Sequence, residues 1–434
     1  MGAHSGSGFR ILLGALFGLA LAGCVDSSRE PEQPRPAPPP PPAAGSDDEE
    51  EEEVEEEEEF TSLNMLTNLV DAVIVPNYVA LADATSAFAD DDGRLAGYCE
   101  AIGTDTEDAA RTEVQDAWRD AMTAVQTTEM HVFGPVADNG EALRKRILSY
   151  ADAPLSTCGV DISVVLAGDE GFDIQSRSLN QRGYGAIEYL LFNDDLTHTC
   201  APQVPATADW NELEEIERRL KRCDLARVIA TDAADAAATV ADRWEPDGGD
   251  YRATFLDPET TGEALQHLTD GIFAMDLLVK DRKLGIPTGI HDDCSNTACP
   301  ELVESPYARN SFANIGTNAA SFKTLFEGGE GLGFDDFIVN EEFAEVADRF
   351  AANTQDIIDY LEDIDASLYD QVIAIEDDDR GTECLNAFAG PDLRAELSAC
   401  TLVGLVKRVT DDLKIDFVTI VGVALPGGAQ TDND

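Results

Sequence analysis

Apolar residues recur at helical spacing through most of this 434-residue chain. Within residues 262–285, positions three or four residues apart are apolar: Leu265, Leu268, Ile272, Met275 and Val279. This spacing places them on one face of an α-helix. Clear two-residue alternation flanked by turn residues is not found along the chain. The pattern therefore predicts an all-α fold in which helices pack into bundles.

Other segments repeat this periodicity. In residues 106–130, Trp118, Met122 and Val125 share one face, and Glu129 lies on the same stripe one turn later. A long charged helix with an Ala-rich second half is expected at 207–245, where small side chains favour close packing. Further helices are expected at 62–89, 140–151, 309–327, 341–364 and 391–412. The short apolar segments 162–168 and 416–425 fit either a helix or a strand.

The folded part begins near Phe60 and runs for roughly 375 residues, which is more than one hydrophobic core usually supports. Pro and Gly interrupt the helical pattern at 245–258. We therefore predict an N-terminal helical bundle at 60–245 and a C-terminal helical bundle at 259–425, followed by an acidic tail at 426–434.

The first residues are typical of an export signal. Arg10 precedes the apolar run 11–23, which is too short to span a bilayer stably, and Cys24 follows. The segment LAGC resembles a bacterial lipobox, so we predict that residues 1–23 are a signal peptide and that Cys24 is lipidated and anchors the chain. Val25 favours the outer membrane, with the protein facing the periplasm or the cell surface. The alternative is an uncleaved apolar anchor.

Residues 24–59 form a predicted tether. A Pro-rich stretch is followed at 47–59 by twelve acidic residues around Val54. Like charges at this density oppose collapse, so disorder is expected and a spacer role is favoured over cation buffering or partner docking. The net charge of the whole chain is −57, which excludes nucleic acid as a partner.

Nine cysteines are present, and setting Cys24 aside leaves eight. An even number in an oxidising compartment predicts four disulfides. Sequence does not fix their pairing; a nearest-neighbour assumption gives Cys99–Cys158, Cys200–Cys223, Cys294–Cys299 and Cys384–Cys400. Zinc ligation is less favoured, because no CxxC pair occurs and His is scarce.

Several segments, taken in order, resemble the imelysin family of bacterial cell-envelope proteins. They cover most of the folded part: 73–88, 117–135, 183–192, 277–289, 311–328 and 412–434. The resemblance implies two four-helix-bundle-like halves with a cleft between them, here with cysteines in the connecting loops. It also implies one of two activities, which are proteolysis or a binding role tied to iron uptake.

The segment GYGAIEYLLF, residues 183–192, resembles the GxHxxE motif of that family. Gly183 and Glu188 match the motif, but Gly185 stands in place of its His. A His and a Glu three residues apart share a helix face and can grip one metal, whereas glycine has no donor atom. No HExxH pattern is present either. Peptidase activity is therefore not expected, although a peptidase with an atypical site stays as an alternative.

Glu188 lies in an apolar helix, where an unpaired carboxylate is costly to bury. One hypothesis is an ion pair with Arg182, Arg119 or Arg177 that ties two helices together. A second is a cation or ligand site in the cleft, to which Tyr184 on the same face contributes. A third is a catalytic acid or base.

Glu129 and His131 extend the second hypothesis. If the bundle brings Glu129 beside Glu188, two carboxylates and the imidazole could hold iron, calcium or zinc. The alternative for His131 is an ordinary residue at a helix end. The sequence therefore does not fix the identity of a cofactor, and iron or another divalent cation is the candidate.

The sequence favours non-catalytic binding of a ligand or metal, linked to iron acquisition and to an iron-uptake or other envelope partner. An envelope scaffold or interaction protein is the remaining alternative.

Overall fold

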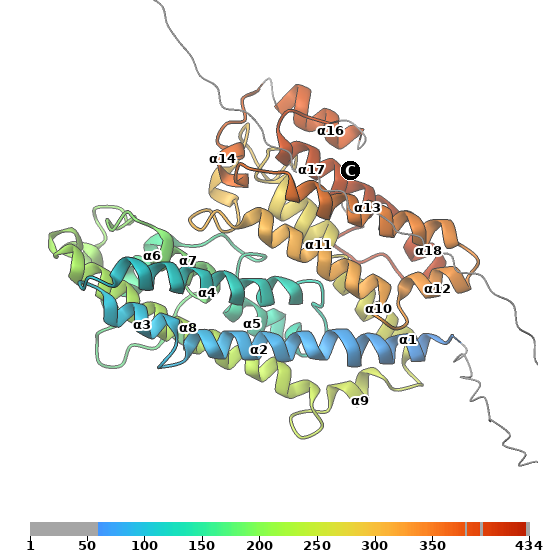
Figure 1. Ribbon diagram of the computed structural model, residues 1–434, viewed down its shortest axis with the longest axis horizontal. Helices are drawn as coiled ribbons and strands as arrows, with labels where there is room; N and C mark the ends of the chain where they lie inside the picture. The colour runs from blue at the N-terminus through green and yellow to red at the C-terminus, as the bar shows by residue number, and fades with distance from the viewer. Residues whose placement is uncertain (1–59, 378–379, 391–393, 431–434) are drawn as a thin grey trace, which may run out of the picture. The chain divides into compact units, whose positions relative to one another are not determined.

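A computed structural model describes residues 60–377, 380–390 and 394–430 (Figure 1). These residues form helices joined by loops, with no strand among them, so the predicted all-α fold is confirmed. The predicted signal peptide 1–23, Cys24, the tether 24–59 and the last four residues of the acidic tail lie outside the described residues.

A first group of helices covers the N-terminal part. Its α-helices are α1 (Ser62–Asn68), α2 (Val75–Ala89), α3 (Arg94–Ala101), α4 (Glu107–Thr128), α5 (Asp138–Ile147), α6 (Thr157–Leu166), α7 (Gly183–Phe192) and α8 (Glu215–Trp244). A π-helical turn, η1 (Leu69–Ile74), joins α1 to α2. Short 3-10 segments are η2 (Gly134–Val136), η3 (Ile174–Ser176), η4 (Leu179–Gln181), η5 (Pro205–Thr207) and η6 (Trp210–Glu212).

The long helix α8 organises this group. It contacts α2, α5 and α7, and α2 also packs against α4 (Figure 1). Its Ala-rich half faces inward: Ala226, Ala230, Ala233 and Ala237 are completely buried. Small side chains let the neighbouring backbones approach closely, which is what the composition of this segment predicts. By length and composition alone Ser62–Ala101 could cross a membrane, but its apolar residues, such as Leu66 and Leu69, lie in the core.

A second group follows. Its α-helices are α9 (Tyr251–Phe255), α10 (Thr261–Ile272), α11 (Ser311–Glu327), α12 (Phe334–Asn340), α13 (Ala344–Glu362), α14 (Leu368–Val372), α16 (Leu385–Ala389), α17 (Ser398–Asp412) and α18 (Val418–Val421). Its π-helices are η7 (Met275–Gly285), η9 (Arg380–Cys384) and η10 (Leu413–Phe417), and η8 (Pro300–Leu302) is a 3-10 turn. Helix α13 packs against both α11 and α17, and α17 also packs against η7.

The two groups share one apolar core. Helix α11 packs against α4, and α1 contacts α10. Buried residues from both groups, such as Trp118 and Phe322, belong to one continuous cluster. The division into bundles at 60–245 and 259–425 stays a prediction, but the surface where the predicted halves meet is well defined, and it carries the site described below.

Several helix boundaries differ from the prediction: the helix expected at 391–412 begins at Ser398, and the one expected at 140–151 ends at Ile147. The helix expected from 207 begins at Glu215, because Trp210 is buried in a 3-10 turn and Leu213 is extended. The ambiguous segment 416–425 is helical as far as Val421. It stops at Gly422, whose φ of 74° ends a helix in the left-handed conformation.

Four disulfides are present, as predicted, but two of the predicted pairings are wrong. The bonds are Cys99–Cys223, Cys158–Cys200, Cys294–Cys299 and Cys384–Cys400. The nearest-neighbour assumption paired Cys99 with Cys158 and Cys200 with Cys223. It failed because α3 packs against α8, which brings Cys99 to a partner 124 residues away.

Because the disulfides close loops of different length, they should contribute unequally to the free energy of unfolding. Replacing both cysteines of Cys99–Cys223 by Ala should lower the free energy of unfolding by about 5 kcal/mol in the loop-entropy model, because the bond closes a 124-residue loop. The same change at Cys294–Cys299, which closes a loop of 5 residues, should cost about 2 kcal/mol. Urea unfolding of both variants tests this, and equal losses would contradict the entropic account.

Candidate functional site

The first turn of α7 fixes the site. Gly183 has φ of 74°, and a Cβ there would lie 2.6 Å from the carbonyl oxygen of Ile147. Only glycine fits this close approach in the left-handed region. Trp118 Nε1 donates a hydrogen bond of 3.1 Å to the carbonyl of Tyr184, which ties the start of α7 to α4. The first glycine of the motif is therefore a requirement of the backbone.

Glu188 lies one turn further along α7 and is 2 % exposed. Its Oε1 accepts hydrogen bonds of 2.8 Å from the backbone N–H groups of both Tyr307 and Ala308. These two bonds join α7 to the loop before α11, which belongs to the second group of helices. Within the described residues Oε2 has no hydrogen bond, so one carboxyl oxygen is available to a ligand.

None of the predicted arginine partners pairs with Glu188. Arg182 Nη1 lies 3.4 Å from Asp232 Oδ2, Arg119 pairs with Asp116 at 2.9 Å, and Arg177 donates to the Ser163 hydroxyl. The prediction of an ion pair was wrong because backbone N–H groups, which carry no sequence signal, satisfy the buried carboxyl instead.

Burial changes the chemistry of Glu188. Desolvation raises its pKa to about 8; the N–H groups of Ala308 and Tyr307 oppose this rise, and the nearby charge of Glu304 adds to it. The group is therefore mostly protonated at neutral pH. A neutral carboxyl group avoids most of the cost of burying a charge, and its proton can be given up to a cationic ligand.

A cavity of about 90 Å³ opens beside Glu188. Both groups of helices line it: Leu148, Ser149, Tyr150, Pro154, Thr157, Gly185 and Glu188 from the first, and Glu301, Val303, Glu304, Ser305 and Tyr307 from the second. Three of these side chains are acidic and none is Lys or Arg. A Cβ added at Gly185 would meet no atom within 4 Å, so the position of the missing His faces open space.

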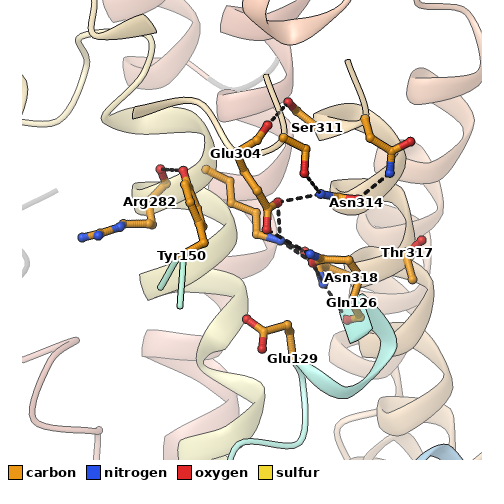
Figure 2. A network of polar contacts seen from close by, with 12 residues as sticks. Gln126, Glu129, Tyr150, Arg282, Glu304, Ser311, Asn314, Thr317 and Asn318 are labelled. Atoms are coloured by element: carbon orange, nitrogen blue, oxygen red, sulfur yellow. Dashed lines mark hydrogen bonds and ion pairs between the residues drawn. The ribbon is translucent and has the colours of Figure 1, made fainter. Parts of the chain in front are cut away.

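A buried polar network supports the wall formed by Glu304 (Figure 2). Lys283 Nζ contacts Gln126 Oε1 at 2.5 Å, Asn318 Oδ1 at 2.7 Å and Glu304 Oε2 at 3.0 Å, which uses all three of its protons. Glu304 Oε1 accepts from Gln126 Nε2 at 2.9 Å, and its Oε2 accepts from Asn314 at 3.0 Å. The charges are therefore paired and hydrogen-bonded, which is the condition for burying them.

Helices α4, η7 and α11 all contribute to this network. The carbonyl of Gln126 also accepts from Asn318 Nδ2 at 2.8 Å. Tyr150 lies against the same region and donates to the carbonyls of Arg282 at 3.0 Å and Leu302 at 2.7 Å (Figure 2). Glu304 and Tyr150, which line the cavity, are thus held in place by segments far apart in the sequence.

The other predicted site residues are engaged elsewhere. Glu129 forms a two-point ion pair with Arg144, at 2.7 and 2.9 Å. Buried His131 contacts Asn77 through Nε2 at 2.8 Å, and burial lowers its pKa to about 4, so its imidazole is neutral. Tyr184 lies in the core against Phe88, at a ring distance of 5.8 Å.

A metal centre made from these side chains is not supported. No group of three or more His, Cys, Asp or Glu side chains within the described residues could hold a metal ion. The hypothesis that Glu129, His131 and Glu188 act together is therefore wrong, because Arg144 and Asn77 occupy the first two. Gly185 has no donor atom, and the single free oxygen of Glu188 is not enough to hold a transition metal tightly.

Sequence reasoning missed the network, although one signal was present. Lys283 continues the apolar stripe of Met275 and Val279 by four residues, so a buried lysine could have been inferred. Glu304 and Tyr307 lie in a loop without periodicity. No sequence pattern indicates that they reach the site.

Comparison with known proteins identifies the family. A family model described as Imelysin, peptidase family M75, matches residues 74–397, which is most of the chain. This chain belongs to the imelysin family. No curated protein sequence matches it.

Two solved structures share the imelysin fold with this chain. An imelysin-like protein from Psychrobacter arcticum has a TM-score of 0.60 at 14 % identity, covering 85 % of this chain and 98 % of the other. A "putative iron-regulated protein A precursor" from Parabacteroides distasonis has a TM-score of 0.54 at 17 % identity, covering 81 % and 95 %. At these identities the likeness shows the fold alone.

The raised pKa of Glu188 predicts a pH-dependent cost to stability. Between the unfolded pKa of 4.5 and the folded pKa of about 8, the folded state keeps a proton that the unfolded state loses, so stability falls as pH rises. Glu188→Gln should abolish this slope and be more stable than wild type at pH 9 by roughly 2–4 kcal/mol, but not at pH 4. Urea unfolding at both pH values tests it, and parallel profiles would refute the buried neutral carboxyl.

The network gives a second prediction. Lys283→Met leaves Glu304 buried without its cation and should lower the free energy of unfolding by about 3–5 kcal/mol. The double variant Lys283→Met/Glu304→Gln removes both charges and should recover most of this loss. Lys323→Met, which breaks the half-exposed pair with Glu327 on α11, is the matched control and should cost less than about 1 kcal/mol. Similar losses for Lys283→Met and Lys323→Met would contradict this account.

Proposed function

We propose that this imelysin-family chain is a non-catalytic binding protein that receives the cationic end of a small organic ligand in the cavity beside Glu188. The observation that carries the proposal is that Glu188, with Oε2 free of hydrogen bonds to the described residues, lines a cavity that is open beside Gly185. Glu188 in its ionised form and the exposed Glu301 supply the negative charge for a positive group such as an amine, whereas the charge of Glu304 is balanced by Lys283.

The volume of the cavity beside Glu188 limits the size of the ligand group that can bind in it. About 90 Å³ accommodates a terminal group rather than a whole drug-sized molecule, so the rest of the ligand would extend outward. Binding is favoured over peptidase chemistry, because none of the described residues lining the cavity is His or Cys. Glu188 therefore has no imidazole partner with which to activate water.

The cellular context of this proposal comes from the sequence and from relatives. The N-terminal segment supports export and anchoring at the outer membrane through Cys24, facing the periplasm or the cell surface. A neighbour of similar fold bears the name of an iron-regulated protein, which supports a role linked to iron acquisition. Mass spectrometry of the membrane-extracted chain would test the anchor by detecting acyl groups on Cys24.

Filling the cavity should abolish binding without harming the fold. Gly185→Leu places a side chain in open space, so stability should hold or rise slightly, by about 0.5–1 kcal/mol, because glycine is a poor helix former. Thermal shift against a panel of small amines should show stabilisation in the wild type, of roughly 2.7 kcal/mol at 100 times the dissociation constant. Gly185→Leu should lose it.

Control measurements distinguish loss of the binding site from loss of the fold. Gly97→Leu makes the same change at another helical glycine with open space around it, and should keep amine binding. Affinity should rise as pH increases through about 8, because the deprotonated carboxylate of Glu188 is the form that pairs with a cation. Unchanged binding in Gly185→Leu, or stabilisation by Fe, Zn, Ca or Mn ions and by no amine, would overturn the proposal.

A further inference from the structure

A second cavity gathers arginines in a chain that has few cations. The sequence contains 29 Lys and Arg residues against 86 Asp and Glu. Four arginines nevertheless line one cavity of about 300 Å³: Arg111, Arg218, Arg219 and Arg222. It lies where α3, α4 and the start of α8 meet the loop after α7. This volume is at the lower end of the range of small-molecule sites, about 300–1,000 Å³.

Two of these arginines are already neutralised. Arg111 pairs with Asp194, and Arg219 pairs with Glu107 at 2.8 Å and more loosely with Glu215 at 3.7 Å. Such pairs fix side-chain positions but leave little charge for a ligand. The wall of the cavity is therefore ordered before anything binds.

Arg222 differs, because it is 2 % exposed and has no carboxylate partner among the described residues. Its two terminal nitrogens donate to the carbonyls of Asn193 at 3.0 Å and Asp195 at 2.9 Å, and its guanidinium lies 5.2 Å from the ring centre of Tyr189. Its Nε has no hydrogen bond. The hydrogen bonds of Arg222 are all to neutral carbonyls, so its charge is only partly balanced, by the nearby carboxylate of Asp195.

Arg218 adds to this charge from one turn earlier on α8. It donates to the carbonyl of Leu196 at 3.2 Å, and within the described chain it also has no ion-pair partner. The carboxylate of Asp195 on the loop attracts both Arg218 and Arg222, but it forms no direct ion pair with either, and its Oδ1 accepts from the backbone and hydroxyl of Thr197 at 2.9 and 2.8 Å. Leu190, Leu191 and Leu196 give the same cavity an apolar wall.

We propose that this cavity binds a small organic anion, with carboxylate or phosphate oxygens accepting from Arg218 and Arg222 and an apolar body against the leucines. Guanidinium groups match both oxyanions in a forked geometry. The site is separate from the cavity beside Glu188. It does not depend on the function proposed there.

Isothermal titration of the purified chain at low salt tests the site, with citrate as the carboxylate probe and glycerol 3-phosphate as the phosphate probe. One or both should bind, and binding should weaken as salt rises. Arg218→Gln removes a half-buried cation and should weaken binding about tenfold or more while the fold persists. Arg222→Gln should weaken it further, with circular dichroism confirming that this buried variant is folded.

Arg227→Gln is the matched control. Arg227 lies on the same helix outside the cavity and pairs with Asp91 at the surface, so affinity should stay within about twofold. Binding of citrate alone assigns a carboxylate ligand, and binding of glycerol 3-phosphate alone assigns a phosphate ligand. No binding of either probe, or equal losses in Arg218→Gln and Arg227→Gln, overturns the proposal.

Discussion

One buried ammonium group holds the site together. Lys283 reaches side chains of α4 and α11 and the carboxylate of Glu304, so three remote segments meet at one atom. Glu304 lies in the same loop as Tyr307 and Ala308, whose N–H groups hold Glu188. The position of Glu188 therefore depends on a charge pair that it does not touch. A polar network in which every group is hydrogen-bonded makes a core rigid. If one member is removed, its partner stays buried as an unpaired charge, and the full cost of its desolvation destabilises the fold.

The same arrangement shows that the framework of the site does not depend on a side chain at position 185. The backbone conformation at position 183 requires glycine, and two backbone N–H groups hold the carboxyl group of Glu188 in place. Neither of these depends on the residue at position 185. A side chain at position 185 would therefore change the lining of the cavity and leave the framework unchanged. With glycine there, the cavity keeps open space beside a carboxyl group that is mostly neutral at pH 7. Such a group can switch between donating a hydrogen bond and pairing with a cation at little cost in free energy.

Periodicity predicted most of the helices because burial of one helix face leaves a trace in the sequence. It could also have placed Lys283, which continues an apolar stripe. It could not find Glu304 or the donors to Glu188, because loop residues and backbone N–H groups leave no such trace. Disulfide pairing failed for a related reason: Cys99 meets Cys223 only because α3 packs on α8. Contacts between distant segments are set by tertiary packing, and no local pattern encodes them.

Helix α7 lines both cavities, through Leu190 and Leu191 on one and Gly185 and Glu188 on the other. The ring of Tyr189 lies against Arg222, with the guanidinium carbon 5.2 Å from its centre, and against the ring of Tyr307 at 5.2 Å. The Tyr189 hydroxyl donates to Asp161 at 2.9 Å, which fixes the ring between them. An aromatic ring is an effective spacer here, because its face attracts the cation while its body excludes water from both sides. Tyr189 and Tyr307 thus stand between Arg222 and the cavity that Tyr307 lines.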